Sequence, residues 1–306
     1  MFAFLLRRLL STLAVLLCVI SITFLLVRIA PGGPFSRERK LPPAIEQQLV
    51  AKYQLDGSLS SQFSRYLGNL ASGQLGISTK YRDRSVNELI AQSLPVSLTL
   101  GSAALLISTL AGIWLGALAA TKKGSWMDTV AMLAALALLS LPMFVAGPLL
   151  ALFFAIKLPL LPVGGWNSPQ SILLPALTLA GPAIAYVARL TRSSLLEVLG
   201  QDYIRTARAK GLSELTVTYR HALKVGILPV ISFLGPLAAN LLTGSIVVES
   251  VFNLPGAGSF FVNSIVNRDV FLLGGIVIVY CTLLCVLNLF ADAAYAWLNP
   301  RIRLAD

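Results

Sequence analysis

Long apolar segments, separated by shorter polar ones, dominate this chain. A helix needs about 20 apolar residues to cross about 30 Å of hydrocarbon. Segments of that length cover residues 9–29, 95–120, 128–156, 172–190, 226–248 and 271–298. The pattern therefore predicts an all-α polytopic membrane protein with six transmembrane helices. Pro142 lies near the middle of the third segment and should kink that helix, because proline removes a backbone hydrogen bond.

Basic residues in the short loops set the expected orientation. Short cytoplasmic loops collect Lys and Arg, and one alternating set of loops holds most of them. That set comprises Arg7, Arg8, Lys122, Lys123, Arg192, Arg205, Arg208, Lys210, Arg220, Lys224, Arg301 and Arg303, whereas the short loops of the other set hold only Lys157 and Arg268. We therefore expect both termini in the cytoplasm, with residues 1–29 as the N-terminus and an uncleaved first span, and residues 299–306 as a tail.

The long outer loop of residues 30–94 carries helical periodicity. Its apolar residues recur at helical spacing in two stretches: Ile45, Leu49 and Tyr53, and then Phe63, Tyr66, Leu67 and Leu70. Ser85 and Glu88 have the spacing of a capping box, which would start a helix leading into the second span. We expect this loop to fold as a small helical cap on the extracytoplasmic face. A tether without a role is the alternative.

Two glycine-containing motifs mark further backbone features. Gly112 and Gly116 form a G-x-x-x-G in the second span, which lets helices approach closely. Residues 254–258, Leu-Pro-Gly-Ala-Gly, break the helix at the outer surface. This break is either a re-entrant turn shielded by protein or an ordinary surface turn.

Composition narrows the chemistry. The chain is 56% apolar and 12% charged with a net charge of +11, whereas a soluble domain carries roughly 25% charged residues. The basic residues punctuate apolar segments instead of gathering on one soluble face, so we expect a lipid bilayer as partner and no nucleic acid. Cys281 and Cys285 share a helix face, where two small core residues explain them better than a metal pair. With a single histidine and no G-x-x-x-x-G-K-[ST] motif, we expect no catalytic residue, metal or cofactor in this chain.

The most informative polar segment lies in the cytoplasmic loop of residues 193–225. Asp202 is suited to cap a helix N-terminus, and Gly211 is suited to end that helix in the left-handed conformation. Lys210 complements the dipole at the C-terminal end. Ser213 is suited to cap a second helix that runs on toward the fifth span.

The short helix between these caps has small residues on its surface. Ala207 and Ala209 would let another protein come close. A short rigid helix on a cytoplasmic loop suits a mechanical contact, because it can sit in a groove and transmit a push. A basic helix lying on the inner lipid surface would give the same local pattern.

This segment resembles the coupling loop of binding-protein-dependent ABC permeases, in particular their oligopeptide/dipeptide branch. The resemblance rests on residues 204–212 (Ile-Arg-Thr-Ala-Arg-Ala-Lys-Gly-Leu), 221–224 (His-Ala-Leu-Lys) and Leu228-Pro229. Further matching stretches are residues 4–10, 28–32, 94–97, 254–258 and 299–303, while residues 34–43 and 164–167 are similar to the B-type subunits of that branch. The generic motif begins with Glu-Ala-Ala and has a shorter spacing to Leu-Pro. The peptide branch shares both departures.

The resemblance implies a type I ABC importer permease fold with a five-span core over residues 95–298. It implies as partners a second homologous permease subunit, two cytoplasmic ABC ATPases that use ATP and Mg²⁺, an extracytoplasmic peptide-binding protein and a peptide substrate. ATP binding would move the coupling helices inward and open the path outward. The coupling residues would be Tyr203, Arg205, Thr206, Ala207, Arg208, Ala209, Lys210, Gly211 and Leu212.

Three polar residues within the spans are candidates for the translocation path or its gate: Glu249, Asn240 and Asp292. A central charge costs on the order of 2.5–3.5 kcal/mol on insertion scales, so such residues usually face the bundle interior or water. For Glu249 the alternative is an ion pair with Arg268. For Asp292 a structural pair, for instance with Arg301, is the better explanation.

Other functions fit the sequence less well. Within the same class, the substrate could instead be a dipeptide, a nickel chelate or glutathione. An ion-coupled secondary transporter would show inverted repeats and more buried ionisable residues. A membrane enzyme would need a carboxylate pair or metal-ligand cluster that the sequence lacks.

Overall fold

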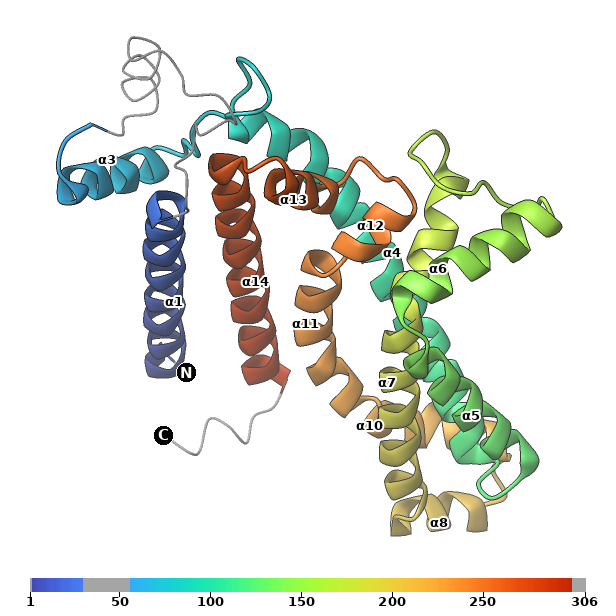
Figure 1. The fold of residues 1–306 in the computed structure, drawn as a ribbon. Coiled ribbons are helices and arrows are strands. Elements are labelled where there is room, and N and C mark those ends of the chain that lie inside the picture. The colour runs from blue at the N-terminus through green and yellow to red at the C-terminus, as the bar shows by residue number, and fades with distance from the viewer. Residues whose placement is uncertain (1, 30–55, 299–306) are drawn as a thin grey trace. The chain divides into compact units, whose positions relative to one another are not determined.

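The computed structural model describes residues 2–29 and 56–298, and every regular element in this part of the chain is helical. In chain order these elements are α1 (Phe2–Ile29), α3 (Leu59–Ala71), α4 (Val86–Thr121), α5 (Trp126–Ser140), α6 (Met143–Ala151), η1 (Leu152–Lys157), η2 (Pro169–Ile172), α7 (Leu173–Leu199), α8 (Asp202–Ala209), α9 (Glu214–Thr216), η3 (Val217–Ala222), α10 (Leu223–Gly226), α11 (Leu228–Thr243), α12 (Ile246–Val251), α13 (Ala257–Val266) and α14 (Val270–Leu298). They are drawn in Figure 1.

Within the described residues, five helical stretches are long and apolar enough to span a membrane, and a bent pair makes a sixth if it is counted as one span. The expected all-α fold is thereby confirmed, with five spans, or six if the bent pair counts as one. The chain divides into two compact units, residues 1–97 with 255–286 and residues 98–254 with 287–306. The first helical stretch expected in the outer loop, around Ile45, Leu49 and Tyr53, lies outside the described residues, as does the tail of residues 299–306.

In the first unit, α3 packs on the end of α1. The ring of Phe24 meets Phe63 edge-on with centroids 4.9 Å apart and lies 5.6 Å from Tyr66. The Arg28 guanidinium donates to the Gln62 side-chain oxygen at 2.8 Å. Burial raises the pKa of Tyr66 to about 12. The periodicity of the second stretch in the outer loop therefore predicted a real amphipathic helix.

The loop that follows α3 is fastened by one buried carboxylate. Asp269, 1% exposed, accepts hydrogen bonds from the Ser78 hydroxyl and from the backbone N–H groups of Thr79 and Lys80. It also accepts from the N–H of Leu272 and so caps the start of α14. The sequence offered no local signal for this contact, which joins residues about 190 positions apart.

The expected capping box at the start of α4 is half realised. The Ser85 hydroxyl accepts from the backbone N–H of Glu88 at 3.2 Å. The Glu88 carboxylate faces Arg84 instead, at 3.9 Å.

The second unit is organised around α7, against which α4 and α5 pack. A Cβ placed on Gly112 would lie 2.6 Å from the Cβ of Val187, and one on Gly116 would lie 2.6 Å from the Cβ of Thr191. Both distances are too short for any side chain larger than hydrogen. The G-x-x-x-G motif therefore marks a close helix contact, as expected.

The third span differs from the single kinked helix that the sequence predicts. α5 ends at Ser140, α6 begins at Met143, and the two are bent by 107°. Leu141 is extended (φ −82°, ψ 118°) because the residue before a proline is disfavoured in the helical region. Pro142 then starts a new helix instead of kinking an existing one. This helix continues as the π-helical η1.

The fifth span is also interrupted. α11 ends at Thr243 and α12 begins at Ile246, with Gly244 and Ser245 between them. The chain then turns through Asn253 (φ 51°) before α13 begins at Ala257. The Leu-Pro-Gly-Ala-Gly stretch thus breaks the helix as predicted.

Candidate functional site

The candidate site is the segment that joins α7 to α11, and its centre is the short helix α8. Gln201 is the residue before α8 and makes no side-chain capping bond, while Asp202 lies inside the first turn. The expectation that Asp202 caps the helix is therefore wrong. Its carboxylate pairs instead with Arg205 at 3.4 Å on the exposed surface of the same helix.

The C-terminal end of α8 follows the sequence closely. Gly211 is left-handed (φ 79°). Its N–H donates to the carbonyl of Arg208 at 2.9 Å, and the N–H of Leu212 donates to the carbonyl of Ala207 at 3.4 Å. These two bonds form a Schellman motif, for which glycine is the favoured residue. The chain reverses here, and Ser213 caps α9 by accepting from the N–H of Thr216 at 3.3 Å.

One face of α8 is buried against the chain's own helices. Ile204 is fully buried and Ala207 is 7% exposed. They belong to an apolar cluster with Ala117, Ala120, Leu195, Val198, Val217 and Ala222, from α4, α7 and η3. The small side chain of Ala207 therefore lets α8 approach its own support and does not face outward, contrary to the sequence-based interpretation.

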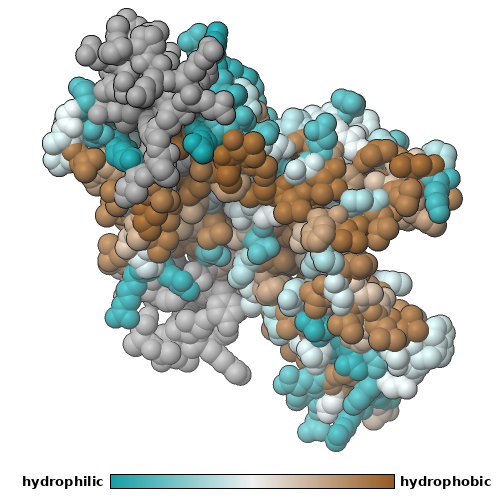
Figure 2. All heavy atoms as spheres, in the orientation of Figure 1, coloured by the Kyte–Doolittle hydropathy of each residue, from teal (hydrophilic) through white to brown (hydrophobic). Residues whose placement is uncertain are grey.

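The other face of α8 is open. Of the nine predicted coupling residues, all except Ala207 are exposed: Tyr203, Arg205, Thr206, Arg208, Ala209, Lys210, Gly211 and Leu212. Figure 2 shows that hydrophilic residues gather over the end of the second unit that carries α8. Ala209, unlike Ala207, is small and exposed, so this part of the helix permits close approach by another surface.

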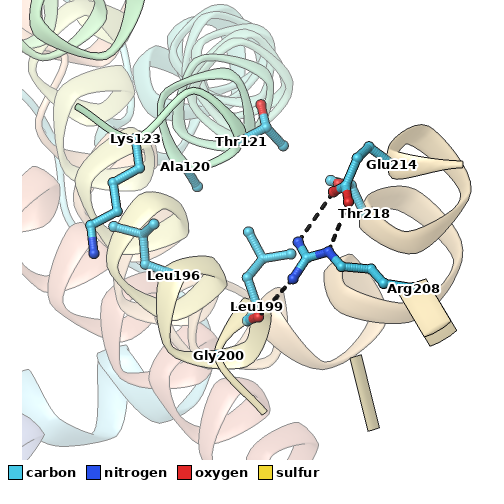
Figure 3. A pocket seen from close by; sticks show the side chains of 9 residues that line it. All are labelled: Ala120, Thr121, Lys123, Leu196, Leu199, Gly200, Arg208, Glu214 and Thr218. Carbon is cyan, nitrogen blue, oxygen red and sulfur yellow. Dashed lines mark hydrogen bonds and ion pairs between the residues drawn. The ribbon is translucent and has the colours of Figure 1, made fainter. Parts of the chain in front are cut away.

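An ion pair ties α8 to α9. Arg208 donates from Nε to one Glu214 carboxylate oxygen at 2.7 Å and from a terminal nitrogen to the other at 3.1 Å. These bonds hold the pKa of Glu214 below its ordinary value of 4.5 and raise the pKa of Arg208. The remaining terminal nitrogen of Arg208 donates to the carbonyl of Leu199 at the end of α7, at 3.5 Å (Figure 3).

A cleft of about 280 Å³ opens beside this ion pair. Its walls come from the end of α4 and the turn after it, the last turn of α7, and the α8–η3 segment. Lys123 lies on the wall away from Arg208, with Leu196 and Leu199 between them in Figure 3. The arrangement leaves the polar side of α8 without tight packing.

A second ion pair of the same geometry joins α7 to α5. Arg192 on α7 donates to both oxygens of Asp128 on α5, at 2.7 and 2.8 Å. The N–H of Gly124 adds a third hydrogen bond to this carboxylate at 3.1 Å. Sequence reasoning missed both pairs. Two signals were available in the sequence. Asp128 is a single acidic residue at the start of the third span, and Glu214 follows shortly after the turn at Gly211.

The three candidate path residues are not gathered at α8. Glu249 lies on α12, is fully buried, and accepts a hydrogen bond from the hydroxyl of Ser245. The Asn240 side chain is exposed on α11, and its carbonyl accepts from the N–H of Gly244 at 2.7 Å. The side chain of Asp292 lies outside the described residues. The role of all three as path or gate stays a prediction.

Metal-ligand groups are sparse. Among the described residues, no three His, Cys, Asp or Glu side chains cluster closely enough to hold a metal ion. Cys281 and Cys285 are free thiols on α14, half-buried and buried respectively.

Comparison with known proteins places this arrangement in a family. Residues 112–304 match the family described as binding-protein-dependent transport system inner membrane component. The chain is 43% identical over 305 residues to the oligopeptide transport system permease protein OppB of Salmonella typhimurium, covering 99% of this chain and 100% of that protein. It is 40% identical over 301 residues to the dipeptide transport system permease protein DppB of Bacillus subtilis, covering 98% of each.

Solved structures agree at the level of the fold. A chain of the MetNI methionine ABC transporter, in an inward-facing conformation, matches with a TM-score of 0.59 at 13% identity, over 69% of this chain and 96% of that one. A chain of an amino acid ABC transporter matches with a TM-score of 0.53 at 18% identity, over 68% and 94%. The family match and the full-length relatives together show that the chain belongs to the binding-protein-dependent transport system inner membrane components, the permease subunits of ABC importers.

Proposed function

We propose that this chain is one of two membrane-spanning subunits of an ATP-driven importer of oligopeptides. The observation that carries the proposal is α8, a short helix mounted on the ends of α4 and α7 with its outer face exposed. Identity of 43% over the full length to an oligopeptide permease supports the substrate class. Identity of 40% to a dipeptide permease makes dipeptides the second candidate.

In this proposal α8 receives the motion of a cytoplasmic ATPase. Two such ATPases bind ATP and Mg²⁺, and this chain performs no catalysis itself. The exposed face from Tyr203 to Leu212 forms the contact, and the buried face passes the displacement to α4 and α7. A second permease subunit completes the path, and a binding protein delivers peptide from outside.

The charge distribution supports an orientation with both termini in the cytoplasm. α8 and the turn between α4 and α5 lie at one end of the second unit, and both are basic. Because cytoplasmic loops collect Lys and Arg, this end faces the ATPases. The protein is then a multi-pass protein of the cell inner membrane.

The test is reconstitution of the complete complex in lipid nanodiscs. ATP hydrolysis and peptide uptake are measured with and without the peptide-loaded binding protein. The variant Ala209→Glu places a charge on the exposed face of α8. Its matched control is Ser193→Glu, on α7 one turn from the exposed Glu197, where a carboxylate is already tolerated.

We expect stimulated hydrolysis in the wild type and the control, and loss of stimulation in Ala209→Glu. Peptide movement without any ATPase partner, with Ala209→Glu equal to wild type, would overturn the proposal. Competition between dipeptides and longer peptides for uptake separates the two substrate classes.

A further inference from the structure

The apolar support of α8 is small for a helix that must carry force. α8 has eight residues, and only Ile204 and Ala207 are buried. Ala207 contributes little area because its side chain is one methyl group. These two side chains hold α8 along a single line of contact. They give little resistance to rotation of the helix about that line.

Arg208 supplies the missing constraint, because its guanidinium contacts the elements on both sides of α8. Two of its nitrogens hold the Glu214 carboxylate at 2.7 and 3.1 Å, which fixes α9. The third donates to the carbonyl of Leu199, which places a cation at the C-terminal end of α7. Because the planar guanidinium is held at both edges, it fixes the orientation of α8 relative to α7 and α9 as well as its distance from them.

The cleft beside the ion pair makes this constraint necessary. The cleft has a volume of about 280 Å³, and its lining includes Arg208 of α8 and Lys123 of the turn after α4. Within the described residues this cleft is open space beside Arg208, so packing alone leaves α8 room to tilt toward it. Arg208 and Glu214 both line the cleft, and Figure 3 shows them joined to each other on one side of it.

We propose that Arg208 and Glu214 are positioning residues, which lock α8 to the end of α7 and to α9 so that a displacement of α8 reaches the spans instead of being lost as tilt. This inference rests on the proposed function of α8. It assigns Glu214 a role although Glu214 lies outside the contact face itself. Without the lock, ATP hydrolysis continues but moves fewer peptides.

The exposure of the Arg208 and Glu214 side chains determines how much stability is lost when this ion pair is broken. The Arg208 and Glu214 side chains are 39% and 69% exposed. An exposed pair adds little to the stability of a fold, so variants should insert and assemble normally. Its modest strength still biases the orientation of α8 by about two- to fivefold.

The experiment measures peptides transported per ATP hydrolysed by the complete complex in proteoliposomes. Glu214→Gln removes the carboxylate charge at unchanged size, and Arg208→Lys keeps the charge but loses the two-pronged geometry. Asp202→Asn is the matched control, because it removes an ion pair that lies wholly within α8. The ATPase that copurifies with each variant reports whether the complex has assembled.

We expect Glu214→Gln to lower the ratio about two- to fivefold with undiminished copurification, and Asp202→Asn to match wild type. Arg208→Lys should lower the ratio to a similar extent. If Glu214→Gln keeps the wild-type ratio, the positioning role is wrong while the proposed function stands. If Glu214→Gln loses the ATPase from the complex, Glu214 belongs to the contact and the positioning role is again wrong. If wild type itself shows no peptide-stimulated hydrolysis, the proposed function fails and this inference fails with it.

Discussion

The second unit contains two arginine–carboxylate pairs with nearly the same geometry and different surroundings. Asp128–Arg192 and Arg208–Glu214 each have a shortest contact of 2.7 Å and two hydrogen bonds. The side chains of Asp128 and Arg192 are 8% and 29% exposed, whereas those of Arg208 and Glu214 are 39% and 69% exposed. The first joins α5 to α7 inside the scaffold, whereas the second joins short elements beside a cleft.

Two ion pairs of similar geometry therefore differ in role when their exposure to water differs. Removing one partner of a buried pair leaves a charge without compensation, so the pair is costly to break. An exposed partner regains water, so the pair can loosen at low cost. The contact between α5 and α7 therefore rests on a pair that is costly to break, whereas α8 is held by a weaker pair that biases its orientation.

The largest expected effect is at the buried pair. Asp128→Ala should lower the free energy of unfolding by about 3 kcal/mol, because the part-buried Arg192 loses two charged hydrogen bonds and the N–H of Gly124 loses a third. Reversible unfolding in mixed micelles measures this change. The double variant Asp128→Leu with Arg192→Met should recover most of the loss, since it leaves no unpaired charge. A loss for Asp128→Ala no larger than that for Glu214→Gln would remove the distinction between the two pairs.

The apolar support of α8 ranks second. Ile204→Ala should cost about 2 kcal/mol, because the fully buried side chain leaves a cavity. Hydrogen exchange of the α8 backbone should rise accordingly. Leu215→Ala is the control, because Leu215 is 71% exposed. Equal exchange in the two variants would mean that α8 is not held by its buried face.

The turn after α8 should show a smaller effect. Gly211→Ala should cost about 1 kcal/mol, because Gly211 has a φ of 79° while no atom lies within 4 Å of the added methyl group. Gly200→Ala is the matched control, because Gly200 ends α7 at an ordinary φ of −83°. Thermal unfolding of the two variants compares them directly. Equal midpoints would show that the left-handed turn is not a constraint.

The smallest effect is the pH response of the exposed pair. Arg208 lowers the pKa of Glu214, so the stabilisation from this pair is present above the unfolded pKa and is lost as the pH falls through the folded pKa, below 4.5. Hydrogen exchange of α8 in wild type and Glu214→Gln should therefore differ by a constant factor from about pH 8 to about pH 5. The two should converge only in more acidic solution. Convergence of the two exchange rates near neutral pH would mean that ionised Glu214 does not stabilise α8 through Arg208.

Local sequence signals predicted much of this molecule. The spans were predictable because crossing hydrocarbon demands a minimum apolar length. The left-handed end of α8 was predictable because Gly211 satisfies a specific backbone need. The same reasoning anticipated α3 and the close contact at Gly112 and Gly116.

Contacts that depend on tertiary register were not predictable. Whether Ala207 faces inward or outward depends on which side of α8 meets α4 and α7, and a short helix with few apolar residues does not reveal it. The pairing of Asp128 with Arg192 spans 64 positions. The 107° break at Leu141 and Pro142 was underestimated because proline signals an interruption but not its angle.

Cross-linking of α8 to the ATPase tests the central claim most directly. In a variant whose natural cysteines are replaced by serine, Ala209→Cys on α8 and Ser193→Cys on α7 are each treated in the assembled complex with a short reagent that joins a thiol to a lysine amine. We expect a covalent product of this chain with an ATPase subunit from Ala209→Cys and none from Ser193→Cys. The absence of that product from Ala209→Cys, or its equal formation from Ser193→Cys, would contradict the account.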